Sequence, residues 1–174
     1  MKIGIVTFVH AYNYGAELQC FALQRKLRNL GYDCEVLDIY RPIDPQYKET
    51  AESKERFKQL YSHNSSADLK AKIHMRVSRV LSSILNIIFH RRFIVRANNF
   101  SEFHNKYTKL SNHTYTNFLE LYSAELPYTH LIVGSDQVWN YMNKFSVEPF
   151  FLTFDNKAKK ISYAASIGHA DIPQ

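Results

Sequence analysis

Residues 131–140 read Leu131-Ile132-Val133-Gly134-Ser135-Asp136-Gln137-Val138-Trp139-Asn140. The stretch begins with a short apolar run that ends at a glycine, and a polar cluster with the only tryptophan of the chain follows. An apolar run of this length, closed by glycine, predicts a buried strand that ends in a loop. In open α/β sheets, ligands bind in the crevice outside such strand ends. Segments that build the same sheet are therefore candidates for one shared binding site.

Three other segments have the composition of strands, and a helical pattern joins the first two. Residues 2–8, 34–40 and 160–166 are rich in β-branched, aromatic or apolar side chains, which predicts strands. Between the first two, apolar residues recur at spacings of three and four, which predicts a helix, and Gly31 stands where a helix ends; these apolar residues are Ala16, Cys20, Leu23, Leu27 and Leu30. Such a βαβ unit makes the first two strands parallel.

The middle of the chain is expected to be helical. Apolar residues between 73 and 88 follow helical spacing, and basic residues crowd the same region. Because this region is too long for an ordinary crossover helix, we expect an inserted helical region at about residues 50–107. Residues 116–124 predict a short helix, and 149–154 predict either a strand or a short packed segment. The fold class is therefore α/β, with a Rossmann-like parallel sheet in one domain spanning residues 1–174.

Composition narrows the classes of function. The 174 residues, 45% hydrophobic, are enough for one domain with a core. Cys20 and Cys34 lack metal-site spacing, and no apolar run approaches the ~20 residues of a membrane span, so we expect a reduced, cytoplasmic chain without a transmembrane segment. The net charge of +6 permits anionic partners but selects none, and no nucleic-acid-binding module is recognised. The basic residues of 76–96 predict a solvated face or, as the lesser alternative, peripheral contact with a membrane.

Polar residues follow three of the predicted strands, and parallel strands bring such loops to one edge of a sheet. The Asn13-Tyr14-Gly15 loop precedes a helix N-terminus, which can hold an anion. The alternative for this loop is an N-cap and a turn glycine that serve only the fold. After the third predicted strand, Asp136 could act as a base or orient a sugar hydroxyl, and Trp139 could stack on a sugar. Capping by Asp136 and Asn140 and core packing by Trp139 are the simpler interpretation from these residues alone.

Two histidines lie in these loops. His10 and His169 are candidates for a general acid or base because imidazole titrates near neutrality, with a solvated side chain as the alternative for each. The chain holds no HExxH motif, paired CxxC motif, Walker A loop or GxGxxG motif. We therefore expect no metal site and no nucleotide cofactor.

Three separated motifs resemble the N-terminal half of the polysaccharide pyruvyl transferase family. The first runs from Lys2 to Phe8 and continues through Asn13-Tyr14-Gly15-Ala16-Glu17-Leu18-Gln19 and Ala22-Leu23-Gln24. The second is Val133-Gly134-Ser135-Asp136-Gln137-Val138-Trp139-Asn140. The third is Phe151-Leu152 followed by Lys160-Ile161-Ser162-Tyr163-Ala164-Ala165-Ser166-Ile167-Gly168. They occur in the order found in the family and cover nearly the whole chain.

This resemblance implies one half of a glycosyltransferase-B-like architecture, in which two Rossmann-like halves face a cleft. It implies transfer of a pyruvyl group from phosphoenolpyruvate to sugar hydroxyls of a surface polysaccharide or a bacterial cell-wall glycan. The acceptor could be lipid-linked, which would place the protein at the inner face of the membrane. The donor is a substrate, and no further cofactor is implied.

The resemblance also implies which residues bind the substrate and which part of the enzyme these residues lack. The implied substrate-binding positions are Asn13, Tyr14, Gly15, Gly134, Ser135, Asp136, Gln137, Trp139 and Asn140. Asp136, His10 and His169 are the candidates for catalysis. The C-terminal half-domain, which supplies arginine and histidine residues for the donor, is expected to be absent from these 174 residues, so the isolated chain is expected to be inactive. The alternative is a non-catalytic module that binds a glycan or a partner.

Overall fold

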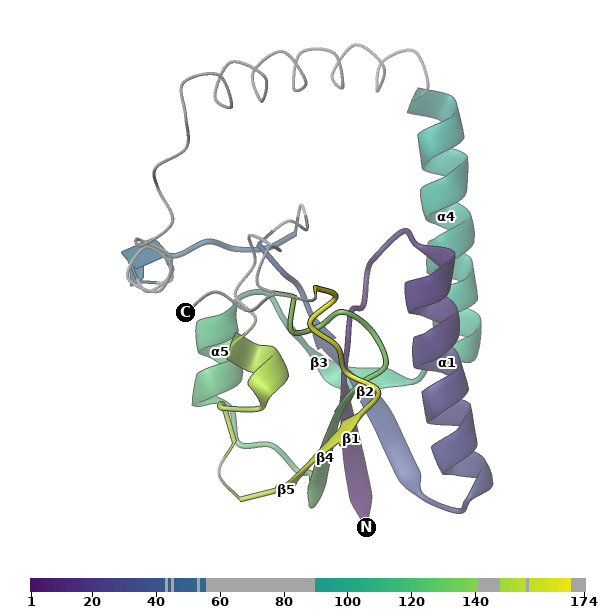
Figure 1. Cartoon of the computed structure of the whole chain (residues 1–174). Helices are drawn as coiled ribbons and strands as arrows, with labels where there is room; N and C mark the ends of the chain where they lie inside the picture. Colours follow the sequence, from purple (N-terminus) through teal and green to yellow (C-terminus); the bar gives the residue numbers. More distant parts are fainter. Residues whose placement is uncertain are drawn as a thin grey trace.

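Five strands form a single sheet with helices on both faces in the computed structural model (Figure 1). The structure describes residues 1–42, 44, 46–52, 54–55, 90–140, 148–155 and 157–169, and only the backbone of 90–93. The strand order is β3-β2-β1-β4-β5, and each neighbouring pair is parallel. This arrangement confirms the expected α/β, Rossmann-like fold class.

The elements follow one another in the order of a doubly wound fold. They are β1 (Lys2–Val6), α1 (Tyr14–Asn29), β2 (Asp33–Ile39), α4 (His90–Tyr107), β3 (Leu110–Tyr115), α5 (Phe118–Ser123), β4 (His130–Gly134), the 3₁₀ helix η2 (Glu148–Phe151) and β5 (Lys159–Tyr163). Helices α1 and α4 lie side by side on one face of the sheet, and α5 and η2 lie on the other (Figure 1).

The strand side chains alternate between two cores. Ile3 and Ile5 of β1 and Ile132 of β4 pack with the apolar face of α1. Leu131 and Val133 of β4 join the second core, beneath α5 and η2. Because successive side chains of a strand point to opposite faces, a run that is apolar at every position has both faces buried. The short apolar run that opens the 131–140 stretch is therefore a central strand, as predicted.

Helix α1 begins and ends with the residues that the sequence indicates. The Asn13 side chain caps its N-terminus. At its C-terminus Gly31 has a φ of +86°, and the amides of Gly31 and Tyr32 donate to the carbonyls of Arg28 and Leu27. This bonding pattern is the Schellman motif, which requires a left-handed residue that glycine adopts at little cost. The expected apolar face is wrong at one position, because Leu30 is the C-cap and is 58% exposed.

Strand β3 is the one described element that the apolar pattern does not predict. It consists of Leu-Ser-Asn-His-Thr-Tyr and lies at an edge of the sheet. Its pairing with β2 is irregular between Val36 and Asp38, where the Ser111 hydroxyl accepts a hydrogen bond from the Asp38 amide. Polar side chains suit an edge strand because one of its sides faces water. For residues 149–154 the short packed segment is correct, since η2 is a 3₁₀ helix.

The inserted helical region is described only in part. Helix α4 covers His90–Tyr107, and residues 56–89, with most of the expected apolar stripe, lie outside the described residues. The short helix expected at 116–124 is α5. Helix α4 matters for the site because it packs beside α1 and so reaches the carboxyl ends of the strands.

Candidate functional site

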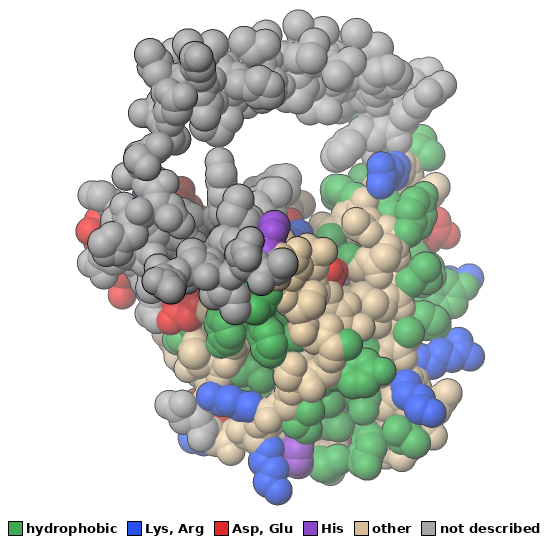
Figure 2. Space-filling model, in the orientation of Figure 1, with side chains coloured by type: hydrophobic (Ala, Val, Ile, Leu, Met, Phe, Trp, Pro, Cys, Tyr) green, Lys and Arg blue, Asp and Glu red, His purple; other side chains and the backbone are tan. Residues whose placement is uncertain are grey.

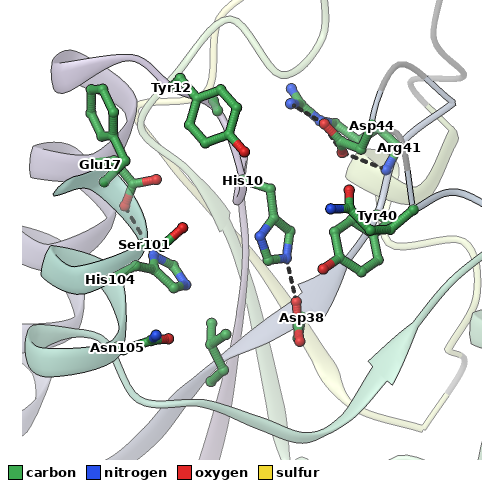
Figure 3. A pocket seen from close by; sticks show the side chains of 14 residues that line it. His10, Tyr12, Glu17, Asp38, Tyr40, Arg41, Asp44, Ser101, His104 and Asn105 are labelled. Carbon is green, nitrogen blue, oxygen red and sulfur yellow. Dashed lines mark hydrogen bonds and ion pairs between the residues drawn. The ribbon is translucent and has the colours of Figure 1, made fainter. Parts of the chain in front are cut away.

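A cavity of about 660 Å³ lies at the carboxyl ends of β1 and β2 (Figure 3). Its walls come from the loop after β1, the first turn of α1, the end of β2 and the segment after it, and α4. Its polar lining residues are His10, Tyr12, Glu17, Asp38, Tyr40, Arg41, Asp44, Gln46, Ser101, His104 and Asn105. The cavity therefore lies at the edge of the sheet where ligands bind in doubly wound folds.

One wall holds a histidine fixed by a carboxylate. The Nε2 atom of His10 lies 2.5 Å from Oδ1 of Asp38, whose other oxygen accepts a hydrogen bond from Thr114 at 2.6 Å. The His10 ring also stacks on Tyr40, with ring centroids 4.3 Å apart. His10 has a φ of +60°, a left-handed conformation in which histidine is more frequent than most residues. The ring is thus held from its Nε2 edge and from one face.

The opposite wall holds a second pair of the same kind. Nδ1 of His104, on α4, lies 3.0 Å from Oε2 of Glu17, on α1. Both side chains are more than nine-tenths buried, with exposures of 8% and 6%. The two imidazole rings have centroids 5.8 Å apart and line the same cavity (Figure 3). The cavity therefore presents two histidines, each oriented by its own carboxylate.

Carboxylates dominate the electrostatics of the cavity. Burial alone would raise the pKa of Asp38, but hydrogen bonds from His10 and Thr114 outweigh it and hold the pKa below its usual value, so this carboxylate is ionised near neutral pH. Burial, together with Asp38 and Asp44, raises the pKa of Tyr40 and keeps its phenol protonated. Arg41 donates to both oxygens of Asp44, so its charge is already paired. A neutral ligand rich in hydroxyl groups suits this lining better than an anionic ligand, because the lining carboxylates would repel an anion.

Cys20 is chemically inert in this structure. It is buried beside Glu17 on α1, and burial together with the negative charge of Glu17 raises its pKa to about 12. A thiol with such a pKa is a poor nucleophile at neutral pH. Cys34 is also buried and free, so the expectation of two reduced cysteines agrees with the described geometry.

His10 is the sequence-predicted residue that lines this cavity. Tyr14 lies outside the cavity at the start of α1, where it is 68% exposed and faces the guanidinium of Arg96 at 5.8 Å. Asn13 uses its side-chain oxygen to accept hydrogen bonds from the amides of Gly15 and Ala16, at 2.8 and 3.3 Å. The Asn13 side chain therefore acts as the N-cap, one of the two alternatives that the sequence leaves open. Its oxygen occupies the positive end of the helix, where the other alternative places a bound anion.

Replacing Asn13 with alanine is expected to lower the free energy of unfolding by about 1 kcal/mol, because the cap of α1 is lost. Asn13→Asp keeps an acceptor at the same place and should retain most of the stability. Urea denaturation followed by circular dichroism measures both. Weaker sugar binding by Asn13→Asp at unchanged stability would instead assign the side chain to a ligand.

The 134–140 stretch meets the loop after β5, as expected for parallel strands. The amide of Ser135 donates to the carbonyl of Tyr163, and Trp139 and Ser166 are joined through backbone hydrogen bonds that also involve Asp136. Gly168 has a φ of +74°, and a Cβ there would lie 2.6 Å from the Gln137 side chain. These contacts make one tight double loop at the ends of β4 and β5.

Three side chains of the 134–140 stretch make hydrogen bonds within the stretch, and Trp139 bonds to η2. The Asp136 carboxylate accepts from the Gln137 amide, and the Asn140 side chain donates to that of Gln137. The Trp139 indole donates to the carbonyl of Phe150 and stacks on Phe151, with centroids 5.4 Å apart. None of residues 134–140 is among the described residues that line the 660 Å³ cavity, and His169 is exposed and likewise outside that lining. Their assignment as binding residues stays a prediction.

Of the four residues in the two histidine–carboxylate pairs, only His10 is a site residue that the sequence predicts. Asp38 lies within an apolar strand, where a buried carboxylate is a signal of a paired or functional group. Glu17 stands in the first turn of α1, where an acidic residue suits the helix dipole by itself, so its burial against His104 has no signal in the sequence. His104 has no local signal, because its position follows from the packing of α4 beside α1.

Two further observations concern ions and membranes. Among the residues described here, no three or more His, Cys, Asp or Glu side chains form a group that could hold a metal ion. Within the same part of the chain, no helix is long and apolar enough to cross a membrane. Among the residues that Figure 2 colours by type, the Lys and Arg side chains on this face lie in separate groups between apolar and neutral surface. Most of the basic side chains of 76–96 lie outside the part of the chain whose side chains the structure describes.

Comparison with known proteins identifies one family. The model of the polysaccharide pyruvyl transferase family matches residues 13–174. No curated protein and no solved structure matches the chain. The family match covers the double loop, both histidine–carboxylate pairs except His10 itself, and four of the five strands. The chain belongs to the polysaccharide pyruvyl transferase family.

Proposed function

We propose that this chain forms the sugar-binding side of a pyruvyl transferase, in which a pyruvyl group moves from phosphoenolpyruvate to a hydroxyl of a surface polysaccharide or cell-wall glycan. The observation that carries the proposal is the His10–Asp38 pair, which faces a cavity at the carboxyl edge of the sheet. The family membership supports the type of reaction. The cavity, at about 660 Å³, is of the size that small ligands occupy in proteins.

The lining favours the acceptor over the donor. Glu17, Asp38 and Asp44 all face the cavity, and the guanidinium of Arg41 is bonded to Asp44. A phosphate and a carboxylate on one donor would need several cations for stabilisation. Sugar hydroxyls instead donate to carboxylates and imidazole nitrogens and accept from phenol and amide groups. We therefore propose that phosphoenolpyruvate binds outside this cavity, to groups other than its carboxylate-rich lining.

His10 suits the removal of a proton from the attacking hydroxyl. With its Nε2–H donated to Asp38, Nδ1 of the neutral ring is an acceptor. Asp38 stabilises the imidazolium that forms when this nitrogen takes the proton, as a carboxylate does in other histidine–carboxylate pairs. Asp38 acts here as a positioning residue, since it works through His10.

His10→Gln is expected to weaken binding of the preferred methyl pyranoside about tenfold, which corresponds to the loss of one good hydrogen bond. Calorimetric titration with the methyl galacto-, gluco- and mannopyranosides measures the effect. His130→Gln is the matched control, because His130 lies at the start of β4 and bonds to its neighbour Thr129. Equal loss in both variants would contradict a specific role for His10.

The isolated chain is proposed to be catalytically incomplete. The resemblance assigns donor binding to a second half-domain, and the described cavity lacks free arginines that could replace it. We expect no pyruvate ketal, by ¹³C NMR, when the 174-residue chain is incubated with phosphoenolpyruvate and the methyl pyranosides. Clear turnover would contradict this part of the proposal.

The carboxylate-rich lining also favours a second candidate, a glycan-binding module without chemistry. Both candidates predict sugar binding that depends on His10. They differ when the chain is expressed together with the coding sequence downstream of Gln174: a transferase then forms the ketal and releases phosphate, whereas a module does not.

We also propose that the protein works in the cytoplasm, on a lipid-linked acceptor at the inner face of the membrane. The support is the chemistry of the family, because surface glycans are long polymers that are built on anchored precursors. Co-sedimentation with vesicles that contain a polyprenyl-linked sugar, compared with vesicles of the same charge without it, tests this part of the proposal. Equal binding to both vesicles would contradict it.

A further inference from the structure

The second histidine–carboxylate pair has an atom that no protein group satisfies. Nε2 of His104 is buried and has no hydrogen-bond partner. The only comparable side-chain atoms among the described residues are Oε1 of Gln19 and Oγ1 of Thr108, and neither residue lines the cavity. A buried polar atom without a partner costs about 1–3 kcal/mol, so its presence beside a cavity points to a group that arrives with a ligand.

The hydrogen bond to Glu17 defines what this atom offers. Glu17 accepts from Nδ1–H of His104, so in the neutral ring Nε2 is an acceptor. Glu17 stabilises the imidazolium once Nε2 takes a proton. His10 lies across the cavity from this pair, Asp38 lies beyond His10, and Cys20 lies beside Glu17. The cavity is also lined by the titratable residues Tyr12, Tyr40, Arg41 and Asp44. His104 is therefore arranged as a base in the same way as His10.

We propose that His10 and His104 act on two hydroxyls of the same sugar, one histidine for each of the two oxygens that become the ketal. This inference rests on the proposed pyruvyl transfer. A ketal has two sugar oxygens on one carbon, so two O–H bonds must break. The ring centroids are 5.8 Å apart, and hydrogen bonds to hydroxyls span about 2.7 Å, so the two rings can reach neighbouring hydroxyls of one sugar ring.

The bonds and protons balance with two bases. In the first addition the proton of one hydroxyl passes to one histidine, and its oxygen bonds to the central carbon of the enol phosphate. The carbon–carbon double bond opens at the same time, and the methylene carbon takes a proton from solvent to become a methyl group. In the second step the other hydroxyl gives its proton to the other histidine, its oxygen bonds to the same carbon, and the bond from that carbon to the phosphate oxygen breaks. Both imidazolium protons then return to solvent. One of them replaces the proton that the methyl group took from solvent, and the other is bound by the released phosphate.

The proposed ketal restricts the acceptor. The sugar must carry two hydroxyls close enough to close one ring through a single carbon, as in a vicinal or a 4,6-diol. A sugar with one of the two hydroxyls blocked should still contact one histidine but lose the other. Glu17 is a positioning residue for His104, as Asp38 is for His10.

Imidazole ¹⁵N NMR of the full chain tests the inference without requiring turnover. The probes are the three methyl pyranosides and, for the one that binds, its derivatives methylated at single hydroxyls. We expect the ¹⁵N resonances of the free nitrogens of both His10 and His104 to shift when the parent sugar binds. One methylated derivative should abolish the shift of His10, and a second derivative, methylated at another hydroxyl, should abolish the shift of His104. His113 and His130, which lie outside the cavity lining, are internal controls.

Variants separate a ligand contact from a structural role. His104→Gln is expected to weaken binding of the parent sugar about tenfold, whereas Thr108→Val, which removes another buried unpartnered atom near the end of α4, should not change it. Circular dichroism and a thermal melt show whether each variant is folded. If His104→Gln does not fold, the ¹⁵N shift of His104 in the wild-type chain tests the inference instead. A shift of His10 alone would overturn this inference and leave the proposed function standing. No shift of either histidine with any of the sugars would overturn both.

Discussion

The variant His104→Ala is expected to unfold with a free energy about 3 kcal/mol lower than that of the wild-type chain, because it leaves the Glu17 carboxylate buried without its partner. The two side chains are 3.0 Å apart and more than nine-tenths buried, so water does not screen the pair to the extent that it does at a surface. Urea denaturation at pH 7 measures the difference.

A double variant shows whether the stability loss comes from the unpaired Glu17 carboxylate or from the cavity that the missing ring leaves. Glu17→Gln/His104→Ala removes the buried charge as well as the imidazole, so it should recover a large part of the stability that His104→Ala loses. If both variants lose the same amount of stability, the cavity left by the ring is responsible, and the unpaired Glu17 carboxylate contributes little. The result also matters for the site, because the same pair orients the free nitrogen of His104.

Gly134→Ala is expected to lower the free energy of unfolding by about 1–3 kcal/mol and to separate the ends of β4 and β5. A Cβ at this position would lie 2.4 Å from the carbonyl oxygen of Tyr163. That oxygen belongs to the backbone and accepts the hydrogen bond of the Ser135 amide, so it cannot move aside as a side chain would. Urea denaturation measures the loss, and amide hydrogen exchange at Ser135 reports the separation.

Gly15→Ala is the matched control for this substitution. Its Cβ would lie 3.2 Å from the flexible end of the Asn13 side chain, and alanine is favoured over glycine within a helix. We therefore expect a change smaller than about 1 kcal/mol. A similar large loss at both positions would mean that added volume near the loops, rather than the contact with Tyr163, destabilises the chain.

The double loop can be found from sequence motifs, whereas the cavity cannot. The double loop consists of two short stretches, 134–140 and 163–168, each of which is continuous in sequence, and their motifs led to the correct family. The side chains of Asp136, Gln137 and Asn140 make hydrogen bonds within the loop itself. The cavity is built from residues that are far apart in the chain, so no motif announces it.

The sequence by itself determined the parallel sheet, the limits of α1 and the family. Apolar runs such as Leu131–Val133 specify buried strands because both faces of a central strand must leave water, and Gly31 specifies a helix end because only a residue with little steric penalty adopts its φ. Tertiary structure alone decided where β3 and the two histidine pairs lie. His10 and Asp38 are 28 residues apart and Glu17 and His104 are 87 apart, so each pair exists only once β2 lies beside β1 and α4 beside α1. The physical reason is that local patterns report burial and backbone conformation, whereas a polar pair depends on which elements become neighbours.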